Sequence, residues 1–392
     1  MSASNAVVSP SISLAAASTR SRDRLAIATL TPSPARAAAI ASPIPLLAPI
    51  TSAVFPSILK SMRANYRWGT VRVMPGGDLY EQIVDAANDL YGSHDGSRAL
   101  HAKGTWCAGT FTATPEAAEL CRVAHFQGEP VPALIRFSNA SGDPESDDWQ
   151  RDSRGMAVRL RPSNGEETDI LAVTTPAFVS RNLDDFLELI RLRKPDPETG
   201  QPDWEKLGAF LGEHPESQTA VQATLNAEPP ASFATLVYQS PHSFRLRAAD
   251  DSATWVRYRW RPEAGEATLG DDDAKALGSD YLRTELAERL AGGPASFELK
   301  LQIPTEDDPI DDPTAVWPED RERIAAGRLE ITEIVDDPEG GEHIEVFDPT
   351  RVPDGIELSD DPILHARARA YSVSAYRRLG MDVENPSTPP AH

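Results

Sequence analysis

The chain has 392 residues, and its 60 acidic side chains outnumber its 38 lysines and arginines, so the formal net charge at pH 7 is −22. That charge repels phosphate backbones and anionic membranes, which excludes a general nucleic-acid or membrane-surface binder. Its two cysteines, Cys107 and Cys121, are too few for a disulfide framework or a thiolate metal cage, and we expect both to be reduced and buried.

The first 75 residues differ in composition from the rest of the chain. They are rich in alanine, serine and proline and carry eight basic residues against one acidic residue. Such a sequence is typical of a disordered extension or of an organelle-targeting peptide, and both interpretations stay open. Pro43, Pro45 and Pro49 interrupt the apolar stretch and would each remove a helical hydrogen bond, so we expect no membrane span.

We therefore divide the chain into an extension over residues 1–75, a folded domain over residues 76–385 and a tail over residues 386–392. The expected compartment is the cytoplasm, unless the extension acts as a targeting segment. Whether the protein forms a homo-oligomer stays open.

The first half of the folded domain alternates between helical and extended patterns. Residues 79–90 carry apolar side chains at helical spacing, and glycines follow. Residues 132–138 predict a strand that places Arg136 and Ser138 on one face. Residues 169–179 predict another strand running into a turn, and residues 183–192 predict a helix.

The second half is dominated by strands. Residues 244–247 and 255–260 alternate across a short turn, which indicates a hairpin. A helix capped by Ser279 or Asp280 carries leucines at positions 282, 286 and 290. Two further alternating segments cover residues 297–303 and 328–334, and residues 360–379 predict a last helix. These elements favour an α+β fold built on an antiparallel sheet or barrel.

The last helix carries the first candidate chemistry. Arg367, Tyr371 and Arg378 are four and seven residues apart, so they share one helix face. Arg367 can hydrogen-bond the phenolic oxygen of Tyr371 and favour its ionised form, which is a hard ligand for ferric iron. Taken alone, this pair is a weak signal that favours an ordinary helix, and His101 alone favours a structural histidine.

The context comes from a resemblance to haem catalases. Eight segments resemble catalase segments in the same order along the chain, and together they extend over about 280 residues. These segments are Leu100–Gly104, Ile135–Ser138, Arg151–Val158, Tyr281–Leu286, Ala315–Pro318, Phe347–Pro349, Val352–Asp360 and Leu364–Ser372. So many ordered matches are more specific than any one motif.

The resemblance implies a catalase-like antiparallel β-barrel with surrounding helices and a buried haem b. His101 then matches the distal histidine, and Ser138 matches the hydroxyl that orients its imidazole. Tyr371 matches the proximal iron ligand, and Arg367 matches the arginine that supports it. Three further arginines match the residues that bind the haem propionates: Arg98, Arg136 and Arg378.

Two departures from the catalase pattern change the expected activity. The family's Asn-Asn-Thr-Pro segment places its second asparagine over the haem, and here the segment reads Val173-Thr174-Thr175-Pro176. We therefore expect Thr174, with its shorter hydroxyl, to be the partner of His101, and we expect poor binding of a second peroxide. The chain also stops twelve residues after Gly380, so it looks like the small catalase-related peroxidases, without an NADPH-binding domain.

The resemblance implies a haem-dependent peroxidase that reduces hydrogen peroxide or organic hydroperoxides with a small organic reductant and has weak catalase activity. Two alternatives stay open. The same haem pocket could rearrange a fatty-acid hydroperoxide, or the protein could be a non-enzymatic haem carrier or sensor. No nucleic acid is expected as a partner.

Overall fold

The computed structural model of this protein describes residues 78–339 and 343–380, and every structural statement below refers to them. The extension predicted over residues 1–75 and the tail predicted over residues 386–392 lie outside the described residues. So do both ends of the domain predicted over residues 76–385.

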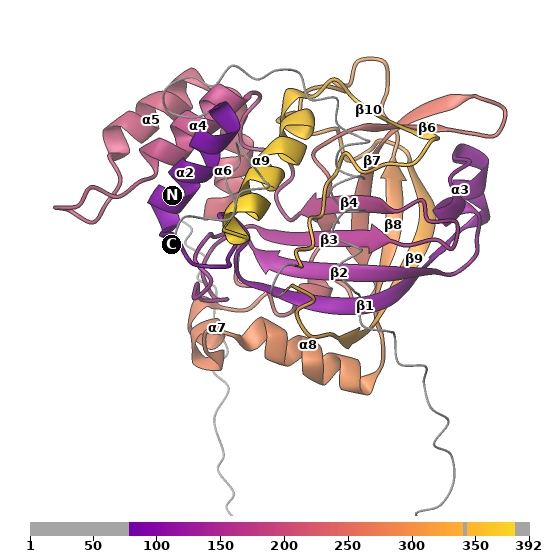
Figure 1. The fold of residues 1–392 in the computed structure, drawn as a ribbon, viewed down its shortest axis with the longest axis horizontal. Coiled ribbons are helices and arrows are strands. Elements are labelled where there is room, and N and C mark those ends of the chain that lie inside the picture. Colours follow the sequence, from indigo (N-terminus) through magenta and orange to yellow (C-terminus); the bar gives the residue numbers. More distant parts are fainter. Residues whose placement is uncertain (1–77, 340–342, 381–392) are drawn as a thin grey trace, which may run out of the picture. The chain divides into compact units, whose positions relative to one another are not determined.

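Within the described residues, eight antiparallel strands close into a barrel (Figure 1). Around the barrel they follow the order β1, β2, β3, β4, β5, β7, β8, β9, and β1 and β7 each pair with a neighbour on both sides. The strands of the barrel are β1 (Gly104–Ala113), β2 (Val131–Asn139), β3 (Arg154–Leu160), β4 (Thr168–Val173), β5 (Tyr238–Gln239), β7 (Ala253–Pro262), β8 (Ala295–Gln302) and β9 (Arg323–Ile334). Two short strands, β6 (Phe244–Arg247) and β10 (Ile356–Leu358), extend the sheet beside β7.

The interior of the barrel is a packed core. Large side chains with almost no exposed surface fill it, among them Phe111, Phe137 and Trp260. Their rings meet edge to face, tilted or stacked, as where the ring centres of Phe111 and Trp260 lie 6.0 Å apart at an interplanar angle of 87°. A Cβ atom at Gly327 on β9 would lie 2.3 Å from Cζ of Phe111, so a glycine there makes room for that ring.

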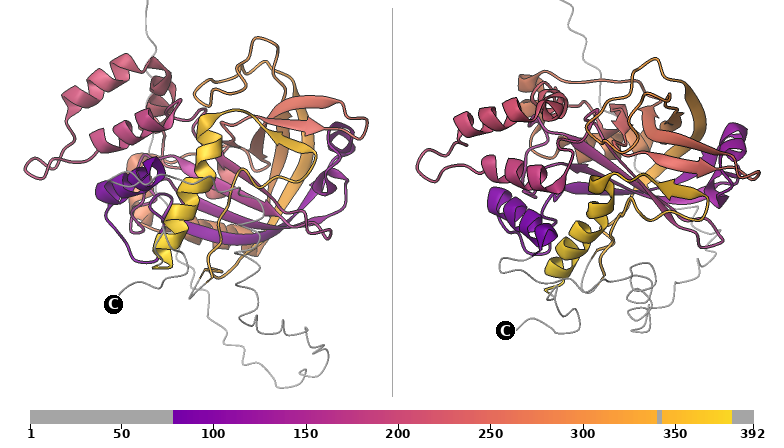
Figure 2. Two further views of the ribbon diagram at one scale, coloured as in Figure 1. Left: turned by 45° about the horizontal axis from the view of Figure 1, so that its top comes forward. Right: turned by 90° about the horizontal axis from the view of Figure 1, so that it is seen from above.

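Helices of the described chain surround the barrel (Figure 2). The helices α2 (Leu79–Tyr91), α4 (Leu183–Leu192) and α9 (Pro362–Arg378) pack against one another. α2 begins with a capping box between Asp78 and Glu81 and ends at Gly92, whose φ is 90°. α8 (Tyr281–Gly292) packs against β9. The remaining helices are α3 (Pro115–Leu120), α5 (Trp204–Glu213), α6 (Gln218–Leu225) and α7 (Asp271–Leu277).

The structure confirms the α+β antiparallel barrel and four predicted helices, namely α2, α4, α8 and α9. Asp280, one of the two predicted caps, occupies the N-cap position of α8. Its side chain makes no capping hydrogen bond, however, and instead forms an ion pair of 2.8 Å with Lys103. The backbone N–H of Leu282 donates to the distant Asp148 carboxylate at 3.0 Å, a tertiary contact without a local signal.

Along the described chain, no helix combines the length and the hydropathy that a membrane crossing requires. Both cysteines are free and buried, as predicted.

Candidate active site

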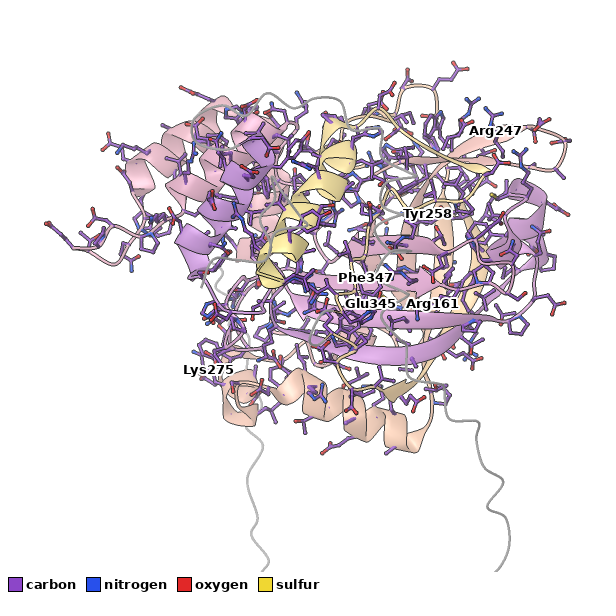
Figure 3. All side chains as sticks on the ribbon, viewed as in Figure 1. Arg161, Arg247, Tyr258, Lys275, Glu345 and Phe347 are labelled. Atoms are coloured by element: carbon purple, nitrogen blue, oxygen red, sulfur yellow. The ribbon has the colours of Figure 1, made fainter. Side chains whose placement is uncertain are left out.

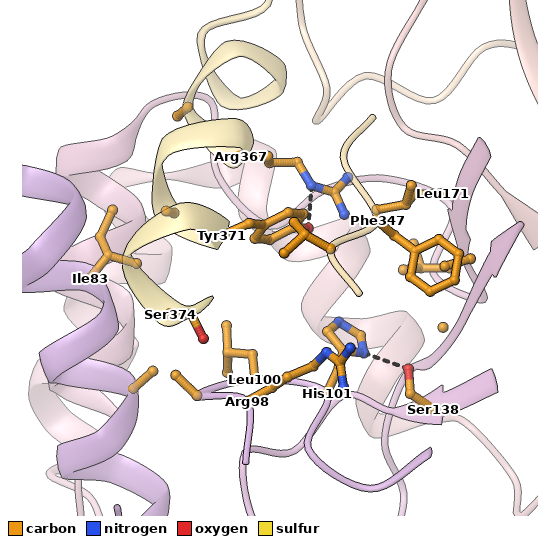
Figure 4. A pocket seen from close by; sticks show the side chains of 18 of the residues that line it. Ile83, Arg98, Leu100, His101, Ser138, Leu171, Phe347, Arg367, Tyr371 and Ser374 are labelled. Atoms are coloured by element: carbon orange, nitrogen blue, oxygen red, sulfur yellow. Dashed lines mark hydrogen bonds between the residues drawn. The ribbon is translucent and has the colours of Figure 1, made fainter. Parts of the chain in front are cut away.

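A cavity between the barrel and α9 brings together seven of the eight predicted site residues (Figure 4). These are Arg98, His101, Arg136, Ser138, Arg367, Tyr371 and Arg378. The helical period places three of them on one face of α9, and the alternation of β2 directs both Arg136 and Ser138 to the cavity. Apolar side chains form the rest of the wall, among them Ile83, Val84, Phe178, Phe186 and Phe347.

The α9 wall carries a chain of hydrogen bonds that ends on Tyr371. Arg367 donates from Nε to the phenolic oxygen of Tyr371 at 2.7 Å. Its Nη1 lies 2.9 Å from Nε2 of His242, and Nδ1 of that histidine lies 2.6 Å from Asp361. Because a guanidinium group only donates, Nε2 of His242 must accept and Nδ1 must carry the hydrogen toward the Asp361 carboxylate.

Burial and the positive charge of Arg367 lower the pKa of His242 to about 4, although Asp361 opposes this shift. The imidazole is therefore neutral at pH 7, in agreement with its role as an acceptor. Asp361 is also the N-cap of α9, because it accepts from the backbone N–H of Ile363 at 2.8 Å. One carboxylate thus fixes both the start of the helix and the orientation of His242.

His242 and Asp361 were missed in the sequence analysis. Asp361 directly precedes Pro362, which is a recognisable start signal for a helix. That signal could have identified the cap, but nothing in the sequence links it to a histidine 119 residues away.

The opposite wall of the cavity carries His101. Its Nδ1 lies 3.0 Å from the Ser138 hydroxyl, as the resemblance implied. The backbone of His101 has a φ of 57°, a left-handed conformation that residues other than glycine rarely adopt. The backbone N–H of His101 donates to the Ala140 carbonyl at 3.1 Å. A Cβ atom at Gly155 of β3 would lie 3.1 Å from Nδ1 of His101, so this glycine allows the imidazole to lie against the strand.

The environment of His101 keeps its imidazole neutral. Burial lowers its pKa to about 3, and the positive charges of Arg136 and Arg367 act in the same direction. At neutral pH the ring is therefore a base with a free lone pair rather than a cation.

Thr174 is the one predicted site residue that does not line the cavity, and its predicted role beside His101 stays a prediction. Its hydroxyl accepts from the backbone N–H of Arg154 at 3.0 Å, and Thr174 is not part of the cavity wall. Its neighbour Val173, which pairs with Gly155, lines the cavity instead. Adjacent residues at the end of a strand point to opposite sides, so a shift of one residue exchanges a hydroxyl for an apolar side chain.

The third part of the wall is a group of arginines. Arg98 and Arg136 both lie over the ring of Trp106, with each guanidinium carbon 5.5 Å from the ring centre. Burial lowers the pKa of Arg136 well below its ordinary value, and the charge of Arg98 adds to this effect. The Nε atoms of Arg136 and Arg378 are buried, and neither has a hydrogen-bond partner among the described residues.

These features fit a haem group. Tyr371 offers an arginine-supported oxygen ligand for ferric iron on one wall, and His101 faces the same cavity from the other. The two unpartnered guanidinium nitrogens are suited to carboxylates at the edge of the ring, and the apolar side chains are suited to its faces. Fold and cavity together define the class of barrel-enclosed haem proteins.

The chain belongs to the catalase family, because the family model described as Catalase matches residues 93–387. It is 41% identical over 310 residues to a catalase-related peroxidase of Mycolicibacterium paratuberculosis, covering 79% of this chain and 97% of the relative. It is 31% identical over 320 residues to a catalase-related peroxidase of Synechococcus elongatus, covering 82% and 94%. The catalases and catalase-related peroxidases of this family are haem enzymes.

A solved structure supports the same family. A fungal catalase superposes with a TM-score of 0.65 at 26% sequence identity, covering 81% of this chain and 66% of the fungal chain. The chain spans 44% of the length of Catalase-2 from Bacillus subtilis, at 28% identity.

Proposed function

We propose that this protein is a haem b peroxidase that reduces hydrogen peroxide or organic hydroperoxides with a small organic reductant. The observation that carries this proposal is the placement of a neutral His101 and an arginine-bound Tyr371 in one cavity. Two relatives named catalase-related peroxidases, which the chain matches over nearly their whole length, support it.

In this proposal the α9 wall holds the haem. Tyr371 would bind the iron through its phenolic oxygen, which the hydrogen bond from Nε of Arg367 holds in place. Arg98, Arg136 and Arg378 bind the haem carboxylates. When bound, the haem iron supplies the redox chemistry, accepting oxidising equivalents from a peroxide and passing them to a reductant.

His101 moves the proton. If Nδ1–H donates to the Ser138 hydroxyl, Nε2 keeps its lone pair. Nε2 can then accept a proton from one of the two oxygens of the peroxide. The same nitrogen then returns the proton to the other oxygen as the O–O bond breaks, so that this oxygen leaves as water or as an alcohol. Ser138 therefore acts by holding the ring in the useful tautomer.

Val173 bears on whether a second peroxide or an organic reductant reacts in the next step. Because the β4 residue that lines the cavity is the apolar Val173, its side chain offers a second peroxide no hydrogen-bond donor. We infer that an organic reductant replaces the second peroxide and that dismutation of hydrogen peroxide is weak. The names of the relatives favour peroxidase activity over rearrangement of a fatty-acid hydroperoxide or over haem transport.

Reconstitution with haem tests the proposal. The full chain should give a Soret band, and its consumption of hydrogen peroxide should increase with added phenolic reductant. Rapid oxygen release without any reductant would contradict the peroxidase assignment. Conversion of a lipid hydroperoxide to an isomer, with no reductant consumed, would favour the rearrangement. The cytoplasmic location stays a prediction for fractionation experiments.

A further inference from the structure

A carboxylate of the chain itself lies among the arginines of the cavity. Glu339 follows β9, and its side chain is 12% exposed. Its Oε2 lies 2.7 Å from Nη1 of Arg98, and its Oε1 lies 2.8 Å from Nη2 of the same guanidinium group. Oε1 also lies 2.9 Å from Nη1 of Arg378. Glu339 therefore forms a two-pronged contact with one arginine and bridges it to a second.

The backbone around Glu339 holds this carboxylate in place. Its own N–H donates to Asp337 at 2.8 Å, and its Oε1 accepts from the backbone N–H of Glu345 at 3.0 Å. Glu345 is itself anchored by Arg161 at 3.1 Å (both labelled in Figure 3) and by Arg159. The contacts of Glu339 thus belong to a connected hydrogen-bond network rather than to an isolated ion pair at the surface.

The charges confirm that this site favours an anion. Burial raises the pKa of Glu339, but the charges of Arg98 and Arg378 outweigh burial and bring the pKa below its ordinary value. Burial and the charge of Arg378 also lower the pKa of Arg98, so the two arginines repel each other when no anion lies between them. Removing the anion would leave two cations unpaired in a largely buried place.

The same two guanidinium groups are those that the proposed function assigns to the haem carboxylates. Arg98 has both terminal nitrogens bound to Glu339, so a second carboxylate cannot make the same two-pronged contact at the same time. Arg136 differs, because its Nη2 donates only to the Ala102 carbonyl at 2.9 Å and its Nε has no partner among the described residues. Arg136 is thus ready for a ligand and Arg98 is occupied, while Arg378 gives its Nη1 to Glu339 and keeps an unpartnered Nε among the described residues.

We propose that Glu339 is an internal substitute for a haem carboxylate, which neutralises Arg98 and Arg378 in the haem-free protein and is displaced when haem binds. This inference rests on the proposed function. It predicts opposite effects of Glu339 on two properties: the side chain stabilises the haem-free fold, and it weakens haem binding by competing for the same donors.

The test compares the full-length haem-free protein with the Glu339→Gln variant. Glutamine keeps the size of the side chain but removes its charge, so the melting temperature of the haem-free variant should fall. Its haem affinity, measured by titration of the Soret band, should rise about tenfold, which corresponds to about 1.4 kcal/mol. A haem whose carboxylates are esterified should bind both proteins with similar affinity, because it cannot compete for the arginines.

Asp308→Asn is the matched control. Asp308 is another buried carboxylate bound to an arginine, with Arg321 at 2.6 Å, but this arginine, unlike Arg98 and Arg378, does not line the cavity. Its replacement should lower the melting temperature and leave the haem affinity unchanged. If Glu339→Gln does not fold, Glu339→Asp keeps the charge but shortens the side chain, and it should show the same two effects at smaller size.

Unchanged or weaker haem binding by Glu339→Gln would overturn the inference, since Glu339 would then be neutral toward haem or part of its binding site. If the wild-type protein gives no Soret band on haem addition, the proposed function itself fails. The two failures are therefore distinguishable in one titration series.

Discussion

The α9 wall of the cavity carries a continuous chain of hydrogen bonds from Asp361 to Tyr371, whereas the opposite wall carries His101 with one side-chain partner. Along that chain on the α9 wall, each polar group has a partner of complementary charge or donor type. On the other wall, the imidazole has a strained backbone and cationic neighbours that keep it neutral. The comparison suggests that paired groups hold the cofactor and that an underpaired base performs the proton transfer.

Replacing the oxygen ligand should have the largest effect. Tyr371→Phe removes the phenolic oxygen and leaves Arg367 without its 2.7 Å acceptor, so we expect haem to be lost or bound in another ligation state. The absorption spectrum of the purified variant measures this directly. Tyr376→Phe, on the same helix but not part of the cavity wall, should keep the spectrum of the wild type. Normal haem content and spectrum in Tyr371→Phe would refute the assignment of this wall.

Removing the base should leave haem in place but slow the reaction with peroxide. General acid–base catalysis contributes roughly 10²–10⁴-fold, so His101→Ala should slow peroxide consumption by a factor in that range. Stopped-flow measurements at saturating reductant check this. His94→Ala is the control, because His94 binds only the Tyr91 carbonyl and does not line the cavity. Loss of haem in His101→Ala would contradict the division of roles, in which the α9 wall binds the haem and His101 transfers the proton.

The sequence predicted the helix face of α9 and the polar face of β2, because both follow from local periodicity. The pairing of His101 with Tyr371 depended on the resemblance, since distant segments meet only in the folded barrel. For Thr174, a match of short motifs could not show that the preceding residue, Val173, would line the cavity instead. His242 and Glu339 were missed, because their hydrogen bonds arise from tertiary packing and have no local pattern.

An amide introduced into the wall that carries His101 should give that wall a further hydrogen-bonding side chain and so make it more like the α9 wall. Val173→Asn places a donor in the cavity wall, at the residue that pairs with Gly155 next to His101. We expect the ratio of dismutation to peroxidase activity to rise by about tenfold, the effect of roughly 1.4 kcal/mol from one hydrogen bond. Oxygen release and reductant oxidation measured on one preparation give the ratio. Val173→Leu, which fills the space without a donor, should not raise it. An equal ratio in both variants would contradict the role given to Val173.

The pH dependence should distinguish the lowered pKa of His101 from an ordinary histidine. Because burial and nearby arginines lower this pKa to about 3, the ring stays neutral, and therefore able to accept a proton, down to nearly that pH. The value of kcat/KM for peroxide should then change by less than about twofold between pH 5 and 8. An ordinary pKa of about 6.5 would instead reduce it about thirtyfold at pH 5. A decline centred near pH 6.5 would contradict the neutral-base assignment.

The smallest expected effect lies at the far end of the α9 wall. Asp361→Asn keeps a good N-cap for the helix but removes the negative charge beside His242. Arg367 then meets less compensating charge and draws more electron density from Tyr371, which weakens the anionic donor to iron. The midpoint potential of the haem should rise by roughly some tens of millivolts. For comparison, a tenfold change in a one-electron equilibrium constant corresponds to about 59 mV.

Spectroelectrochemical titration measures that potential, and the neighbouring Asp360→Asn is the control, because Asp360 is exposed and is not the cap of α9. A rise in Asp361→Asn alone, with haem content and melting temperature nearly unchanged, would show that the hydrogen-bond chain transmits charge to the iron ligand. Equal potentials in the two variants would mean that the chain only positions Arg367. The α9 wall would then hold the cofactor without tuning it, and the contrast with the His101 wall would become sharper.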